Sequence, residues 1–269
     1  MSAQGALPLG YGQLAVAASL VLVAGAVSLA LRLKLERTLA IASVRTVVQL
    51  ALVGHLLGFV FGLDSPWVLV VMLLVMIAAA SRAAVARVSR RYRGVEIDAF
   101  ATLLLTALTT TFTVTTLVVQ VRPWHNAQYV VPLLGMVLGN SLTGISLALD
   151  ALLTDLDATR DAVELDLALG ATRWEAARDP LRSAVRRGMI PILNNMSVVG
   201  IVSLPGMMTG QILQGADPVA AVKYQVVVMF MLAASTAIGC MGVALLSVWR
   251  LFDDCHRLRS DRLERRTEH

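Results

Sequence analysis

The chain has 269 residues, of which 57% are hydrophobic and only 15% are charged, and its mean hydropathy is +0.72. A soluble domain carries nearer a quarter of charged residues, so this composition excludes an ordinary soluble protein and predicts a membrane protein. The net charge of +5 does not indicate nucleic-acid binding, because membrane orientation and contact with anionic lipid account for the basic residues.

Seven stretches lack Asp, Glu, Lys and Arg, and each approaches the roughly 17–25 residues that a helix needs to cross the hydrocarbon core. In chain order they are residues 11–31, 46–63, 65–81, 99–121, 126–149, 188–216 and 224–249. No basic residue precedes the first stretch and no small-x-small cleavage site closes it, so we expect a span there and not a signal peptide. The sequence thus predicts an all-α, polytopic membrane protein with about seven transmembrane helices.

Basic residues gather in alternate connections between these spans. The segments that hold 21 of the 23 lysines and arginines are 32–45, 82–97, 150–187 and the residues after 249. By the positive-inside rule this face is cytoplasmic, which places the N-terminus outside and the C-terminus in the cytoplasm. We expect residues 1–249 to form a single transmembrane domain and residues 250–269 to form a charged cytoplasmic tail.

Several kinds of catalytic chemistry are missing from the sequence. The only lysines, Lys34 and Lys223, follow no phosphate-binding glycine run, and the four histidines are too scattered for a metal pair or a triad. Cys240 and Cys255 lack obvious partners, and we expect both to be inert thiols. The chain is therefore not expected to be an enzyme, and any work against a gradient must draw on a partner, a proton or an ion.

The segment 150–187 is the longest polar part of the chain. Apolar residues at helical spacing predict a helix from Asp150 to Leu169, which Gly170 would end because glycine tolerates positive φ. Thr172 and Glu175 have the spacing of a capping box, and Asp179-Pro180 is typical of a further helix start. The segment is either a solvated loop with local caps or a docking element for a cytoplasmic partner.

Two quoted stretches carry a family resemblance. Residues 164–184, "ELDLALGATRWEAARDPLRSA", resemble the cytoplasmic coupling loop of ABC-transporter membrane subunits, although the usual Glu-Ala-Ala opening is here Glu164-Leu165-Asp166. Residues 203–213, "SLPGMMTGQIL", are similar to the FetB-type permeases, which are bacterial iron-export subunits related to plant aluminium-tolerance proteins. The likeness extends over residues 45–249.

This resemblance implies a permease subunit that forms a homodimer in the bacterial plasma (inner) membrane and binds two copies of a cytoplasmic ABC ATPase. The ATPase would bind ATP and magnesium, so no cofactor is expected in this chain. The cargo implied is a metal ion, with iron first. Within a coupling loop at 150–188, the residues expected to meet the ATPase are Glu164, Gly170, Thr172, Arg173, Trp174, Glu175 and Arg178.

A second group of residues is expected along the translocation path. Pro205-Gly206 interrupts the sixth predicted span, and broken helices at membrane depth are tolerated only inside protein or beside water. The residues assigned to the path are Thr106, Thr113, Asn140, Asn194, Asn195, Ser203, Pro205, Gly206, Met207, Met208 and Gln211. The alternatives are a simple kink at Pro205, hydroxyl contacts between helices for the threonines, and close helix packing for the Gly135–Gly139 pair beside Asn140.

The sequence does not identify metal ligands. Methionines are more often core filler than ligands, and Fe²⁺ prefers imidazole or carboxylate. Asp150, Asp157, Asp161 and Glu164 either draw cations toward the inner mouth or form a solvated acidic face. Two other functions stay open, namely export of another small solute and an ion-coupled carrier or membrane scaffold that needs no ATPase.

Overall fold

The computed structural model describes residues 10–63, 65–253, 255 and 257–265, and helices make up most of this part of the chain. The α-helices are α1 (Tyr11–Ala30), α2 (Glu36–Leu63), α3 (Pro66–Val85), α4 (Val95–Thr113), α5 (Ala127–Ala158), α6 (Arg160–Ala168), α7 (Arg173–Ala176), α8 (Arg178–Val198), α9 (Gly206–Leu213) and α10 (Pro218–Leu251). A π-helical turn, η1 (Val114–Val118), extends α4, and a 3₁₀ turn, η2 (Ser260–Arg262), follows α10. Strands β1 (Arg90–Arg91) and β2 (Glu264–Arg265) pair antiparallel.

Short polar residues set the starts of two long helices. The side chain of Asn126 accepts a hydrogen bond from the Gln128 amide at 3.0 Å, which caps α5. Asp217 accepts one from the Ala220 amide at 2.9 Å and is followed by Pro218 at the first helical position of α10. Both caps satisfy amides that have no partner within the helix.

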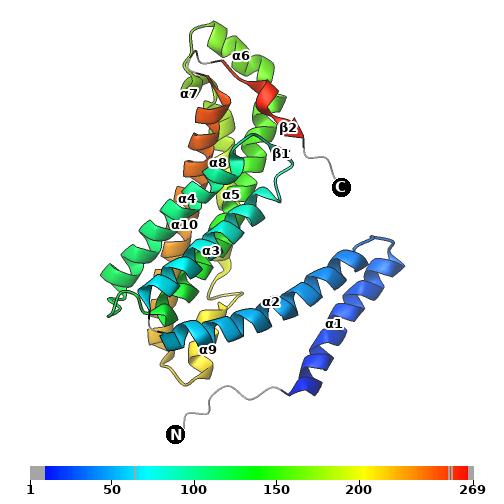
Figure 1. Ribbon diagram of the computed structural model, residues 1–269. Coiled ribbons are helices and arrows are strands. Elements are labelled where there is room, and N and C mark those ends of the chain that lie inside the picture. The colour runs from blue at the N-terminus through cyan, green and yellow to red at the C-terminus, as the bar shows by residue number, and fades with distance from the viewer. Residues whose placement is uncertain (1–9, 64, 254, 256, 266–269) are drawn as a thin grey trace.

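Helices α3, α4, α5, α8 and α10 form a bundle, as Figure 1 shows. At one end Arg187 of α8 pairs with Asp155 of α5 at 3.3 Å, and Arg250 of α10 pairs with Asp98 of α4. At the other end one apolar cluster joins η1, α5, α8 and α10. Helices α3, α5 and α10 therefore run in one direction, and α4 and α8 run in the other.

The two ends of the bundle differ in charge. We call residues 82–93, 150–187 and 250–265 the arginine-rich end, and residues 114–130 and 199–221 the opposite end. The α1–α2 hairpin extends from one end of the bundle (Figure 1), where the second half of α2 contacts α3 and α5, and it is closed by a hydrogen bond of 3.0 Å from Ser28 Oγ to Glu36. Its apolar side chains are largely exposed, as expected of helices that face lipid.

Among the described residues, six helices are long and apolar enough to cross a membrane. This confirms the prediction of an all-α polytopic membrane protein. The six are α1, α2, α3, α4 with η1, α5 and α10. The seventh predicted span, 188–216, is not one continuous helix, because it consists of the second half of α8, a turn and α9. Arginines in the first half of α8 lower its hydropathy, yet α8 still runs between the two ends of the bundle.

Helices α5, α8 and α10 approach one another closely at two glycines. A Cβ placed on Gly188 would lie 2.6 Å from Cys240 Sγ and 2.8 Å from the Gly144 carbonyl oxygen. A Cβ on Gly139, by contrast, would meet nothing within 4 Å. The close approach expected at the Gly135–Gly139 pair is therefore made within this chain at Gly144 instead.

The C-terminal segment packs against the arginine-rich end. Phe252 and Leu258 are buried, and the Arg259 amide donates to the Leu251 carbonyl oxygen at 2.8 Å. Strand β2 then pairs with β1 from the loop between α3 and α4. The described part of the charged tail thus covers the end of the bundle.

We expect Gly188→Ala to destabilise the protein by about 1–3 kcal/mol, because the new methyl group overpacks the contact with Cys240 and Gly144. Gly54→Ala in α2 is the matched control, since an added Cβ there meets nothing within 4 Å and alanine favours the helix. Thermal unfolding in detergent should show a lower midpoint for Gly188→Ala only. Equal midpoints in the two variants would contradict this account of the contact.

Candidate functional site

The loop at the arginine-rich end begins with a helix that stops at Gly170. Helix α5 ends at Ala158, and after a break at Thr159 the chain continues as α6. Gly170 has φ of +95°, its amide donates to Leu167 at 3.1 Å, and the Ala171 amide donates to Asp166 at 3.0 Å. This pair of bonds is a Schellman motif, and it turns the chain sharply toward α7.

Helix α7 is held by the predicted capping box. The Thr172 hydroxyl accepts a bond of 3.4 Å from the Glu175 amide. In return, the Thr172 amide and hydroxyl donate to Glu175 Oε2 at 2.8 and 2.7 Å. These bonds lower the pKa of the Glu175 carboxyl below its ordinary value, and the bond from the Thr172 backbone amide has the largest effect. A helix of only four residues therefore has a fixed orientation.

The same loop presents apolar side chains away from the bundle. Val163 and Ala176 are buried and anchor α6 and α7 to the core. Leu165, Leu169 and Trp174 are exposed, and the guanidinium carbon of Arg173 lies 5.9 Å from the centre of a Trp174 ring. An anchored, capped element with exposed apolar residues is suited to contact another protein.

Helix α8 follows α7 directly. The predicted start with Asp179 as N-cap is wrong, because α8 begins at Arg178 with Ala177 at the cap position. Asp179 lies instead in the first turn, where the positive end of the helix dipole stabilises a carboxylate. The candidate coupling element therefore continues directly into one helix of 21 residues. Its first residue, Arg178, is exposed.

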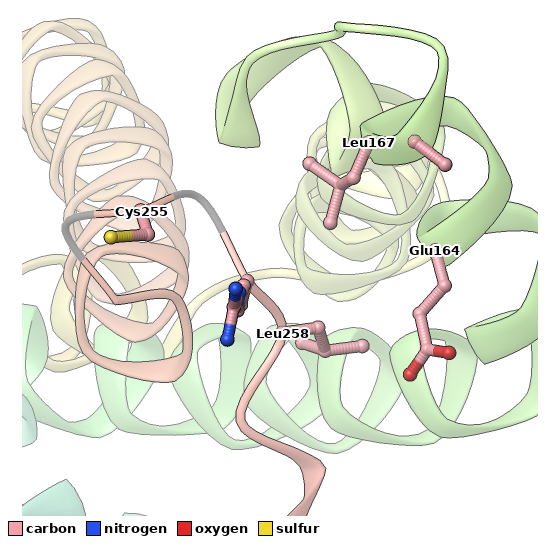
Figure 2. A pocket seen from close by; sticks show the side chains of 6 residues that line it. Glu164, Leu167, Cys255 and Leu258 are labelled. Atoms are coloured by element: carbon pink, nitrogen blue, oxygen red, sulfur yellow. The ribbon is translucent and has the colours of Figure 1, made fainter.

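A cavity of about 420 Å³ separates α6 from the C-terminal segment. In Figure 2, Glu164 and Leu167 of α6 lie across this cavity from Cys255 and Leu258. Glu164 is also bonded to Arg160 Nε at 2.7 Å, so it serves partly to hold α6. Cys255 is exposed.

The acidic residues near this end are mostly engaged in contacts. Asp150 accepts two hydrogen bonds from Ser89, at 2.8 and 2.6 Å, and Asp157 pairs with Arg90. Among the described residues no group of three or more His, Cys, Asp or Glu side chains is placed to hold a metal ion. These carboxylates tie the loop before α4 to α5, and this favours a structural role over a cation-attracting one.

The predicted break lies at the opposite end of the bundle. Helix α8 ends at Val198, whose carbonyl oxygen accepts bonds from the amides of residues 201–203. Gly200 takes φ of +83° in this turn. Pro205 then stands at the cap position of α9, which begins at Gly206. The interruption therefore spans residues 199–205 and is a full turn of the chain, not a kink within one helix.

A cavity of about 280 Å³ lies beside this break, between α5, α8, α9 and α10. The predicted path residues that line it are Asn140, Asn195, Ser203, Pro205, Gly206 and Met207. They come from α5, from α8 and from the stretch 203–207, and their amide and hydroxyl groups contribute polar atoms to the cavity lining.

The other predicted path residues lie elsewhere. Met208 lines a neighbouring cavity of about 450 Å³, and neither cavity is lined by Asn194 or Gln211. Thr106 is buried in the bundle, and no described residue bonds its hydroxyl, whereas Thr113 is exposed. Neither threonine lines either of the two cavities.

Residues 11–252 match an uncharacterised protein family, UPF0014. This match covers nearly all of the membrane part and includes both the candidate coupling element and the cavity. The chain belongs to the UPF0014 family. Relatives of this family that the chain matches, described next, confirm the resemblance to the FetB-type permeases.

Relatives within UPF0014 cover most of this chain. It is 37% identical to the UPF0014 membrane protein slr1647 of Synechocystis over 215 residues, which are 79% of this chain and 82% of the relative. It is 30% identical to the probable iron export permease protein FetB of Escherichia coli, over 94% of this chain and 96% of that protein. The protein ALUMINUM SENSITIVE 3 of Arabidopsis thaliana is also 30% identical, over 91% of this chain and 89% of its own length. No solved structure matches the chain.

Three cavity residues in this UPF0014 member were missed from the sequence. Gln225 is buried on α10 and lines both cavities, and Met136 and Met229 line the first cavity opposite the break. Gln225 is a polar residue at the start of an otherwise apolar run, which was the available signal. For the methionines no pattern was available, because only packing brings residues 136 and 229 together.

The capping box of α7 should weaken as the pH falls. The folded-state pKa of Glu175 is lowered, so its stabilising effect is present above the unfolded pKa and is lost as the pH falls through the folded value. Hydrogen–deuterium exchange, corrected for intrinsic rates, should show protection of residues 175–177 falling with pH. Glu175→Gln retains an acceptor without the titration, so its protection should not depend on pH; equal pH dependence in both proteins would contradict the assignment.

Proposed function

We propose that this chain is the membrane subunit of an ATP-driven exporter of metal ions, with iron first. The observation that carries the proposal is one continuous element, in which the exposed, capped α7 leads directly into α8, and α8 ends at the polar cavity. The name of the Escherichia coli relative, probable iron export permease, supports the choice of cargo.

The loop of α6 and α7 is proposed to dock a cytoplasmic ABC ATPase. Its exposed apolar residues Leu165, Leu169 and Trp174 would enter a groove of the partner, while buried Val163 and Ala176 keep the loop in place. The partner would bind ATP and magnesium, and this chain would need no cofactor. Closure of two ATPase copies would then displace α7 and, through the rigid α8, change the shape of the cavity.

A homodimer is proposed because α8 exposes polar groups along its apolar half. Asn194 and Ser197 are exposed in the single chain, although they lie on the part of α8 that approaches the opposite end. Polar side chains at membrane depth are costly against lipid, so a second copy of the chain or a water-filled path should face them. Either arrangement would extend the cavity into a shared pathway.

The proposed orientation places the arginine-rich end in the cytoplasm of a bacterial cell, with the chain in the plasma (inner) membrane. The described arginines at that end support this choice through the positive-inside rule. The N-terminus would then be outside and the C-terminus in the cytoplasm. The partners proposed are the ATPase, a second copy of this chain and membrane lipid.

Trp174→Ala should weaken binding of the ATPase roughly thirty-fold, since a buried aromatic anchor at an interface contributes about 2 kcal/mol or more. The probe is the ATP-hydrolysing protein that co-purifies with the wild-type chain, titrated against each variant in detergent. Trp67→Ala is the control, because Trp67 is also an exposed tryptophan but lies at the start of α3, away from the loop. Unchanged affinity in the Trp174 variant would reduce the loop to a connector.

Gly206→Leu should lower transport at least tenfold without loss of folded protein. A Cβ at Gly206 meets nothing within 4 Å, so the longer side chain can extend into the cavity without a clash. Gly210→Leu, one turn later in α9 and outside both cavities, should transport normally. ATP-dependent efflux of Fe²⁺ and ATPase binding would be measured on the same preparations in liposomes. Normal efflux by a well-folded Gly206→Leu protein would exclude this cavity from the path.

A further inference from the structure

Methionines that are far apart in the sequence gather around the break after α8. Seven of the eleven lie there, in or beside the apolar cluster that closes the opposite end of the bundle. They are Met136, Met189, Met196, Met207, Met208, Met229 and Met231. The reading of the methionines as scattered core filler therefore does not hold for this region.

Five of these methionines line open space. Met136, Met207 and Met229 line the first cavity, and Met196, Met208 and Met229 line the second. The two cavities share Met229, so their thioethers form one continuous lining from α5, α8, α9 and α10. A side chain that only filled the core would leave no cavity of about 280 Å³ beside it.

Gln225 supplies a second kind of ligand at the boundary between the cavities. Its side chain is only 6% exposed, and no described residue donates a hydrogen bond to its Oε1. A buried carbonyl oxygen without a partner is costly, so an oxygen acceptor aimed at a cavity indicates a ligand there.

The charge of the lining limits what that ligand can be. Among the described residues, neither cavity is lined by Asp, Glu, His, Lys, Arg or Cys. The free energy needed to transfer an ion out of water grows with the square of its charge. This desolvation cost is therefore about four times larger for a divalent cation than for a monovalent cation of equal size. A lining of thioethers, uncharged amides and a hydroxyl offers no negative charge to offset that cost, and thioethers select soft ions such as Cu(I).

We propose that the methionine-lined cavities bind a soft monovalent cation of the Cu(I) and Ag(I) class, with Met207, Met229 and Gln225 as central ligands. The inference goes beyond the proposed function, because it concerns equilibrium binding to this chain alone. If the chain binds Ag(I) but no ATPase docks on it, the proposed exporter is contradicted. If the ATPase docks and Fe²⁺ is exported but Ag(I) does not bind, the proposed cation site is contradicted.

The test is calorimetric titration of Ag(I) into the purified full chain in detergent, in a Cys255→Ser background that removes the exposed thiol. Met207→Leu with Met229→Leu conserves apolar volume, so the fold should persist, and the dissociation constant should rise at least tenfold. Met72→Leu with Met76→Leu on α3 is the matched control and should bind Ag(I) as the parent does. These two methionines line a separate apolar cavity between α2, α3 and α5 and neither of the two proposed to bind the ion. Cu(I) competition with a chromophoric chelator should give the same order of affinities.

Absence of saturable Ag(I) binding, or equal binding by the two double variants, would overturn the proposal. A parallel titration with Fe²⁺ should give at least a hundredfold weaker binding, because the uncharged lining disfavours a divalent ion. X-ray absorption of the Ag(I)-loaded protein should show sulfur neighbours that decrease in the Met207 and Met229 double variant. Only oxygen and nitrogen neighbours would contradict thioether ligation.

Discussion

The bundle depends on how closely α8 approaches α5 and α10. Gly144 and Gly188 bring two backbones together with the Cys240 side chain between them, and no side chain larger than hydrogen fits at either glycine without displacement. Gly188 stands near the middle of α8, so this contact holds the helix at its centre while its two ends meet different surroundings. One end continues from α7 and the other opens into the cavity, and a displacement of the first would therefore be passed to the second about a fixed point.

A polar cluster at the arginine-rich end holds α4 and α10 together. Asp98 of α4 accepts from the Tyr92 hydroxyl at 2.8 Å and pairs with Arg250 of α10, while Tyr92 lies 3.0 Å from Ser247 Oγ. Burial, as the main cause, raises the pKa of Tyr92, so its hydroxyl remains a donor to the carboxylate. Gly94, at φ of +99°, leaves room for the Arg250 guanidinium. Loss of one partner would leave a buried charge unpaired, and α4 and α10 thus form a frame against which α8 is placed.

The sequence predicted the elements better than their contacts. Uncharged runs located the lipid-crossing helices, because hydrophobic length is a direct requirement of the bilayer, and caps at Gly170 and Thr172 follow from local chemistry. The same runs misplaced both boundaries of α8. Charges stop a lipid-compatible stretch without stopping a helix, so α8 begins before residue 188, and it ends at Val198 because the uncharged run contains a turn. Gln225 and the methionines around the break could not be grouped, because their proximity arises only from the packing of four separate segments.

The least apolar long helix of the bundle is the one that joins the loop to the cavity. Its arginines and asparagines make α8 less apolar than the described helices that can cross a membrane, and both follow from its position among the other helices. A helix packed between α5 and α10 has little need of lipid-compatible side chains on every face, and the polar ones are then available to line a path. Among the described residues, no titratable group lines the cavity. This agrees with the proposed exporter, in which α8 would carry the movement of the α6–α7 loop to the cavity.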